Sequence, residues 1–159
     1  MMEKLKICFT SSSGGHFNQL LILSEKYNEF EKFFITEKTN FSQQELKNEK
    51  KFMFNVINRK EKNFKKKFIR LSLSIFKILF KERPDLIIST GALITVPVCY
   101  IGKILGSKVI FIESFAKVNS PTLSGKLVIK IADEFIVQWK ELEREYNNEN
   151  KVKYGGTIY

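Results

Sequence analysis

The chain has 159 residues, of which 43% are hydrophobic and 28% are charged. This length and composition suit one globular domain with a substantial buried core, and they exclude a disordered or fibrous protein. The formal net charge is +10, and the segment 59–83 alone holds ten basic residues and two acidic ones. Such a basic segment on an otherwise nearly neutral domain predicts an anionic partner surface, either a membrane or a nucleic acid.

The two cysteines, Cys8 and Cys99, stand among apolar residues without a CxxC motif or a Cys/His cluster. This pattern predicts buried thiols in a reducing compartment and offers no metal site. The N-terminal apolar stretch is too short for a secretory signal. The longest uncharged apolar run, 92–102, contains Pro97 and is shorter than the ~20 residues that a spanning helix needs. We therefore expect no transmembrane segment.

Hydrophobic periodicity predicts strands that alternate with helices along the whole chain. The predicted strands are 5–10, 32–36, 52–57, 85–90, 108–113 and 134–138, and the predicted helices are one from 17 onward, 64–81, 95–106, 120–131 and 139–147. Segment 37–51 is either a loop or a short surface helix, and the tail from 151 is either a short strand or an extended arm. Pro84 ends the long helix, whereas Thr95 with Pro97, and Ser120 with Pro121, indicate helix starts. The alternation predicts an α/β fold with a single Rossmann-like, doubly wound parallel sheet.

A glycine-rich turn, S-S-S-G-G-H at 11–16, joins the first strand to the first helix. Glycines let backbone N–H groups approach an anion, and the N-terminus of a helix adds partial positive charge, so phosphate is the expected ligand. The alternative is a tight turn with serine caps. The turn matches neither G-x-G-x-x-G nor a Walker loop, which argues against dinucleotide or NTP binding.

Two titratable side chains are predicted at the same edge of the sheet. His16, the only histidine, is either an incidental surface residue or a group that contacts the ligand or transfers a proton. Glu113 is either a capping or solvated acid, or a base or hydroxyl-binding group. Since the carboxyl ends of parallel strands share one edge, Gly91 and Gln138 are expected beside them.

The predicted helix 64–81 carries many basic residues, and apolar residues cover much of its circumference. Its remaining face also holds apolar residues, namely Ile69, Leu73, Phe76 and Phe80. The helix either binds a membrane interface or covers the sheet with a solvated lysine edge. For the membrane interpretation, the expected contacts are Lys65, Lys66, Lys67, Phe68, Arg70 and Phe76.

Six segments together resemble the PssD/CpsF-type polysaccharide biosynthesis subunits. They are S-S-S-G-G-H, P-D-L-I-I-S-T-G, F-I-E-S-F-A, S-P-T-L-S-G-K, A-D-E-F-I-V-Q-W and Y-G-G-T-I-Y, and they extend over essentially the whole chain. Those subunits are bacterial relatives of the membrane-anchor subunit of the eukaryotic transferase that adds the second GlcNAc to dolichyl diphosphate. The resemblance implies that residues 1–159 form the N-terminal, acceptor-binding half of a GT-B glycosyltransferase.

The resemblance also implies a reaction and a partner. A separate chain supplies the nucleotide-sugar domain, and a hexose passes from a UDP-sugar to a polyprenyl-diphosphate-linked saccharide during capsular or exopolysaccharide synthesis. The complex works as a peripheral protein on the cytoplasmic face of the plasma membrane, without a cofactor, a metal or nucleic acid. The alternatives are a non-catalytic enhancer of the partner enzyme, a basic nucleic-acid-binding module, which would lack a recognised reader motif, and a free-standing enzyme.

Site residues follow from similarity to the acceptor half of the peptidoglycan GlcNAc transferase. Its glycine turn and its second loop place the lipid diphosphate on Ser12, Ser13, Gly14, Gly15, His16, Gly91 and Thr95. Either His16 or Glu113 is the implied base. Ile112, Ser114 and Phe115 replace the His, Gln and Asn of that enzyme's H-E-Q-N segment. The tail 149–159 is expected to dock on the partner through Tyr154, Ile158 and Tyr159.

Overall fold

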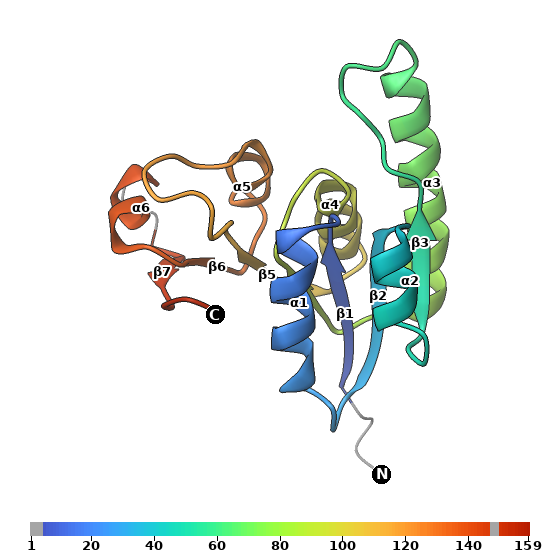
Figure 1. Ribbon diagram of the computed structural model, residues 1–159, viewed down its shortest axis with the longest axis horizontal. Helices are drawn as coiled ribbons and strands as arrows, with labels where there is room; N and C mark the ends of the chain where they lie inside the picture. The colour runs from blue at the N-terminus through green and yellow to red at the C-terminus, as the bar shows by residue number, and fades with distance from the viewer. Residues whose placement is uncertain (1–4, 147–149) are drawn as a thin grey trace.

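The computed structural model describes residues 5–146 and 150–159, which form one parallel sheet covered by helices (Figure 1). The strand order is β3-β2-β1-β4-β5-β6-β7. The strands are β1 (Lys6–Ser11), β2 (Glu31–Glu37), β3 (Lys51–Phe54), β4 (Leu86–Ser89), β5 (Lys108–Ile112), β6 (Glu134–Val137) and β7 (Val152–Tyr154). Every neighbouring pair is parallel. The expected α/β, Rossmann-like class is therefore confirmed.

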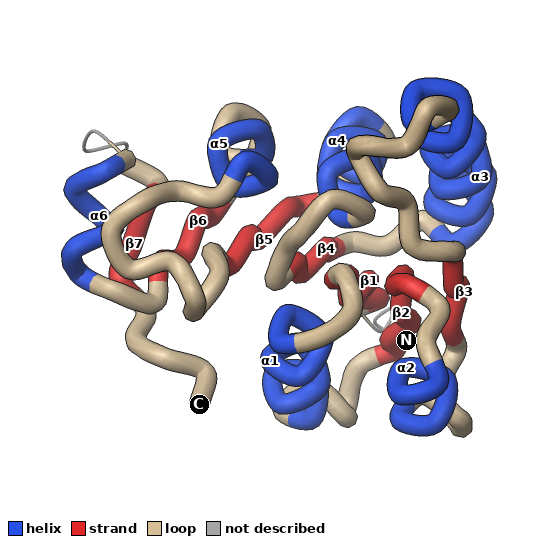
Figure 2. Tube along the Cα trace, turned by 45° about the horizontal axis from the view of Figure 1, so that its top comes forward, coloured by secondary structure: helices blue, strands red, loops and turns tan. Residues whose placement is uncertain are grey.

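Helices cover both faces of this sheet, as Figure 2 shows. They are α1 (Gly15–Glu25), α2 (Asn40–Glu45), α3 (Phe64–Glu82), α4 (Thr95–Ile104), α5 (Leu123–Val128) and α6 (Lys140–Glu145). The helices α1 and α2 lie on one face, and α3, α4 and α5 lie on the other. The crossovers change face between β1 and β4, which places a crevice at the carboxyl ends of these two strands.

The core consists of two apolar clusters, one on each face, because successive side chains of a strand point in opposite directions. In β1, Ile7 and Phe9 pack toward α1, whereas Cys8 packs toward α3 and α4. Each fully buried side chain of this size stabilises the fold by roughly 1.5–3 kcal/mol. Both thiols are free and buried, as expected, and burial raises the pKa of Cys99 to about 12.

Several element boundaries differ from the sequence prediction. The strand β3 ends at Phe54 rather than at 57, and segment 37–51 contains the short helix α2, which begins after the capping residue Thr39. The helix α5 starts after Thr122, whose hydroxyl accepts a hydrogen bond from the Gly125 N–H at 2.9 Å, so the start predicted at Ser120 and Pro121 was wrong. The tail contains the strand β7. The predicted end of the last helix at 147 and the first tail residue, 149, lie outside the described residues.

No helix in the described part of the chain combines the length and the apolar character needed to cross a bilayer. The longest helix, α3, has 19 residues, and its N-terminal half extends beyond the carboxyl edge of the sheet (Figure 1).

Candidate functional site

The glycine turn and the end of β4 meet at the point where the crossovers change face. The Ser12 N–H donates to the Gly91 carbonyl at 2.8 Å, and the Ser12 hydroxyl accepts from the Ala92 N–H at 3.4 Å. Gly14 and Gly91 have φ values of +81° and +90°, which a residue with a Cβ rarely adopts. These two loops therefore form one continuous rim, as the sequence predicted.

His16 is held at this rim by the chain that follows β4. Its Nδ1 atom lies 2.7 Å from the Thr90 carbonyl, and the Thr90 hydroxyl donates to the His16 carbonyl at 2.8 Å. A carbonyl oxygen only accepts, so we assign the ring hydrogen to Nδ1, which leaves the lone pair of a neutral ring on Nε2. In the described part of the chain, Nε2 has no hydrogen-bond partner. His16 therefore presents a proton acceptor.

The first turn of α1 offers open backbone donors beside that ring. Gly14 is the N-cap, and among the described residues no side chain caps the helix. A Cβ placed on Gly14 or Gly15 would meet no atom within 4 Å, so the backbone there is accessible. The first N–H groups of a helix lack internal partners and attract anions. The geometry therefore suits a phosphate group next to His16.

Two of the expected diphosphate contacts are already engaged inside the chain. The backbone N–H and the hydroxyl of Ser13 both donate to Glu37 Oε2, each at 2.8 Å. The buried Thr95 hydroxyl donates to the Ala92 carbonyl at 2.7 Å. The contacts expected from these two side chains do not fit this arrangement. The sequence interpretation had not considered Glu37, which is the last residue of β2.

Glu113 lies at the end of β5, is 1% exposed, and is surrounded by donors. Its carboxylate accepts hydrogen bonds from the Ser114 N–H at 2.7 Å, from the Thr122 N–H at 3.1 Å and from the Thr122 hydroxyl at 2.8 Å. It also accepts one from the hydroxyl of Tyr146. A general base must present an oxygen to the substrate hydroxyl. The geometry thus gives Glu113 a structural role, in which it holds the loop between β5 and α5 against Tyr146.

The phenol of Tyr146 is expected to link stability to alkaline pH. Burial and the adjacent charge and hydrogen bond of Glu113 raise its pKa well above the ordinary value of 10.0. In the unfolded chain Tyr146 ionises near that ordinary value, whereas the folded chain keeps its proton. This contribution to stability is therefore complete below pH ~10 and is lost as the pH rises further.

We expect Tyr146→Phe to lower the free energy of unfolding by about 1–3 kcal/mol near neutral pH, and by progressively less above pH ~10. Urea unfolding of both proteins across this pH range measures the difference. A difference that stays constant up to the highest pH would contradict the proposed link between Glu113 and Tyr146.

The ends of β5 and β6 complete the same rim. The Gln138 side-chain amide donates to the Glu113 carbonyl at 2.9 Å and exchanges hydrogen bonds with Gln19 of α1 at 3.1 and 3.2 Å. This confirms that the segments after β1, β4, β5 and β6 lie along one edge. A cavity of about 220 Å³ opens here, lined by Gly15, His16, Gln19, Ser114, Phe115, Ala116 and Tyr159.

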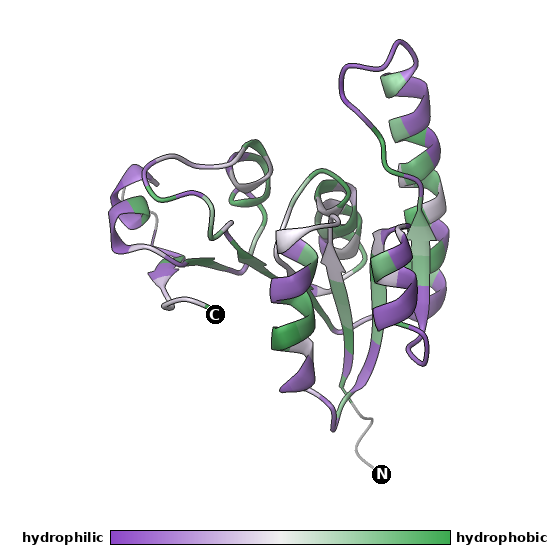
Figure 3. Ribbon diagram, in the orientation of Figure 1, coloured by the Kyte–Doolittle hydropathy of each residue, from purple (hydrophilic) through white to green (hydrophobic). Residues whose placement is uncertain are grey.

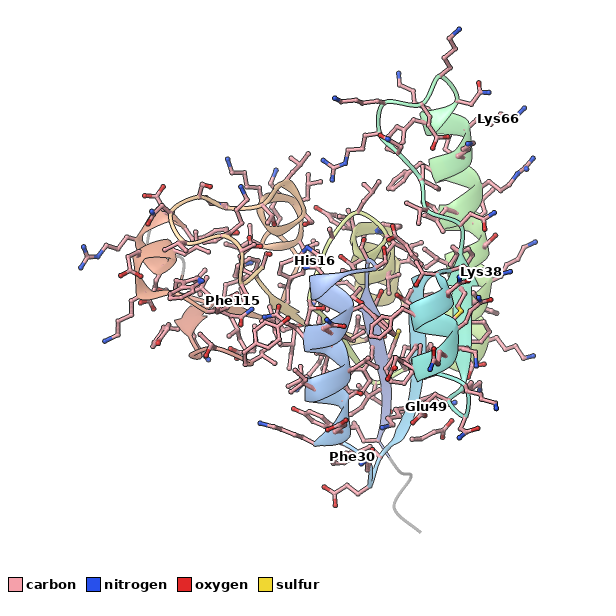
Figure 4. All side chains as sticks on the ribbon, in the orientation of Figure 1. His16, Phe30, Lys38, Glu49, Lys66 and Phe115 are labelled. Atoms are coloured by element: carbon pink, nitrogen blue, oxygen red, sulfur yellow. The ribbon has the colours of Figure 1, made fainter. Side chains whose placement is uncertain are left out.

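The outer face of α3 carries exposed apolar residues beside basic ones. The ribbon in Figure 3 shows hydrophobic and hydrophilic residues alternating along this helix. The exposed apolar residues are Ile69, Leu73, Phe76 and Phe80, which we call the α3 stripe. Lys65, Lys66, Lys67 and Arg70 are also exposed. Of the expected membrane contacts, Phe68 is half-buried and packs against the core. Figure 4 places Lys66 near the tip of α3.

The tail returns toward its own domain. Ile158 is half-buried, and its N–H donates to Gln138 Oε1 at 3.1 Å. The Tyr159 ring lies 5.4 Å from that of Phe115, and its hydroxyl donates to the Gly15 carbonyl at 3.4 Å. Tyr154 is 45% exposed and Tyr159 is 60% exposed. Of the three residues expected to bind a partner, Tyr154 and the outer side of Tyr159 are thus accessible.

The chain is similar to proteins of oligosaccharide biosynthesis. A family model described as "Oligosaccharide biosynthesis protein Alg14 like" matches residues 7–158. The UDP-N-acetylglucosamine transferase subunit ALG14 of Candida albicans is 43% identical over 86 residues, which are 50% of this chain and 38% of that protein. The human subunit is 35% identical over 77 residues, which are 45% of this chain and 36% of that protein. The match covers less than two fifths of either relative.

Solved structures share the fold. MurG of Acinetobacter baumannii superposes with a TM-score of 0.72 at 14% identity, over 86% of this chain and 42% of that chain. UDP-N-acetylglucosamine 2-epimerase from Rickettsia bellii gives 0.74 at 13% identity, over 98% and 46%. Both neighbours have GT-B folds, and this chain matches a Rossmann-like part of each, which is less than half of either solved chain.

Proposed function

Because the chain belongs to the family of Alg14-like oligosaccharide biosynthesis proteins, we propose that it is the acceptor-binding, membrane-associated subunit of a two-chain glycosyltransferase. A polyprenyl-diphosphate-linked saccharide binds to this chain, and a partner chain binds the UDP-sugar. The description of the relatives as UDP-N-acetylglucosamine transferase subunits supports both the partner and N-acetylglucosamine as the hexose. The resemblance to PssD/CpsF-type subunits supports capsular or exopolysaccharide synthesis on the cytoplasmic face of the plasma membrane.

The observation that carries this proposal is the open N-terminus of α1 beside His16, whose Nε2 has no hydrogen-bond partner among the described residues. The first amides of α1 bind the acceptor diphosphate. The acceptor hydroxyl transfers its proton to Nε2 as its oxygen forms a bond to the anomeric carbon of the donor, and UDP leaves with the electron pair of the broken bond. His16 is thus the base in this proposal, and Glu113 holds the adjacent loop.

Ligand binding by the isolated chain tests the acceptor role. We expect farnesyl diphosphate to bind and UDP-N-acetylglucosamine not to bind in calorimetric titrations. Gly15→Val should weaken the binding of farnesyl diphosphate, because its branched side chain fills the space in front of the first amides of α1, which is open in the structure. Asn18→Ala, an exposed change on the same helix, is the control. Binding of the UDP-sugar without binding of the diphosphate would reverse the assignment.

The α3 stripe and the lysines around it are proposed to contact an anionic membrane. Exchanging Lys65, Lys66, Lys67 and Arg70 for Gln should weaken binding to phosphatidylglycerol vesicles at least tenfold, since each cation near the surface contributes about 1 kcal/mol. Added salt should have the same effect. The matched control removes four exposed lysines from other parts of the surface, namely Lys26, Lys47, Lys108 and Lys140.

Vesicle co-sedimentation measures this difference. Equal sedimentation of the two four-residue variants would contradict a specific role for α3. Binding to RNA but not to vesicles would favour the nucleic-acid alternative instead.

The proposed partner surface is the sheet edge at β7 and the tail beyond it. Tyr154 lies on this edge strand and is exposed, and large exposed aromatic residues are frequent anchors of interfaces. The accessible side of Tyr159 extends the same surface. Ile158 supports it from within, because its backbone is bonded to Gln138.

A further inference from the structure

The cavity beside His16 has two chemically different walls. Phe115 and Tyr159 form an aromatic wall, with ring centroids 5.4 Å apart, and Trp139 lies behind Phe115 at 5.0 Å. His16, Gln19 and Ser114 contribute polar groups to the lining. Figure 4 shows His16 at the upper end of α1 and Phe115 on the neighbouring loop.

Two hydrogen bonds hold the aromatic wall in place. The Trp139 indole N–H donates to the Phe115 carbonyl at 2.7 Å, which fixes the loop after β5. The Ile158 N–H donates to Gln138 Oε1, which holds the last two residues against the carboxyl edge of the sheet. Tyr159 therefore closes one side of the cavity, next to Gly15.

The volume and lining of the cavity suit one sugar ring. The cavity holds about 220 Å³, which is below the ~300–1,000 Å³ of sites for drug-sized ligands. A pyranose has an apolar face of C–H groups and an edge of hydroxyls, which match the aromatic and the polar walls respectively.

We propose that this cavity binds the pyranose ring of the acceptor and that Tyr159 forms one of its walls from within the same chain. The inference rests on the proposed function. Gly15 and His16 border both the cavity and the open amides of α1. A sugar in the cavity thus lies next to a diphosphate on those amides, and its hydroxyl edge faces His16.

The single tryptophan makes a direct test practical, because Trp139 contacts Phe115 and its emission reports on the cavity. The probes are farnesyl diphosphate and the same lipid carrying glucose or N-acetylglucosamine. We expect the full chain to bind at least one sugar-bearing probe about tenfold more tightly than the bare diphosphate. Burial of the small apolar face of one sugar ring contributes binding free energy of that order. Phe115→Leu and Tyr159→Ser should remove this preference and leave the affinity for the bare diphosphate unchanged.

Phe41→Ser is the matched control, since it alters an exposed aromatic residue of α2 that does not line the cavity. It should keep the preference for the sugar. Equal affinity of the wild-type chain for bare and sugar-bearing probes would overturn the inference but leave the proposed function intact. Failure of all three probes to bind would instead contradict the acceptor role itself. Retention of the preference by Phe115→Leu and Tyr159→Ser would place the sugar elsewhere.

Discussion

Replacing His16 with alanine is expected to reduce sugar transfer by the assembled transferase about 10²–10⁴-fold, and to lower the free energy of unfolding by only about 1 kcal/mol. The ring contributes the accessible Nε2, whereas its Nδ1 makes one neutral hydrogen bond, to the carbonyl of the buried Thr90. The measurement is kcat with saturating donor and acceptor, together with the urea midpoint of the purified chain.

Asn18→Ala provides the control for this experiment, because Asn18 is exposed near the start of the same helix. It should leave both kcat and the midpoint unchanged. Full activity of His16→Ala would contradict the base assignment. That result would favour the alternative in which the chain only enhances a partner that performs the chemistry alone.

Gly125→Val is expected to cause the largest loss of stability, about 3 kcal/mol or more. A Cβ at position 125 would overlap the Glu113 carboxylate and the Tyr146 hydroxyl. The hydrogen bond between these two groups joins the end of β5 to the segment after α6, so displacing them breaks this connection. Lys126→Val introduces the same side chain at the next, exposed position of α5 and should cost less than about 1 kcal/mol. Urea unfolding compares the two variants.

Glu113→Gln extends this test to a variant that changes no volume. The new amide lacks one acceptor oxygen for the donors of Ser114, Thr122 and Tyr146, and we expect a loss of about 1–3 kcal/mol in the free energy of unfolding. Transfer measured well below the unfolding transition should then remain close to that of the wild type. Unchanged stability together with lost transfer would instead identify Glu113 as the base.

The sequence predicted the architecture because its signals are local. Apolar runs such as those in β1 and β4 mark buried strands, and a parallel sheet brings the residues after each strand to one edge. The glycine turn, Gly91, Glu113 and Gln138 were placed on a common rim for this reason, and the structure confirms it. The positions of these residues in the fold thus followed from topology.

The contacts that the sequence did not predict join residues that are distant in the chain. Nothing near Glu113 in the sequence signals Tyr146, which is 33 residues away. Glu37 engages Ser13 only because β1 and β2 are neighbours in the sheet. Phe68 fits either side of an amphipathic helix that is apolar over much of its girth, and only packing against the sheet decides its direction. Side-chain roles of this kind require the tertiary structure.

Reconstitution tests the two-chain, acceptor-subunit account most directly. Three samples are supplied with UDP-N-acetylglucosamine and a short polyprenyl-diphosphate saccharide. They are this chain alone, the nucleotide-sugar-binding chain that co-purifies with it, and the mixture of the two. The account predicts transfer only by the mixture, and it predicts that His16→Ala in this chain removes that transfer. Equal transfer by either chain alone would contradict it.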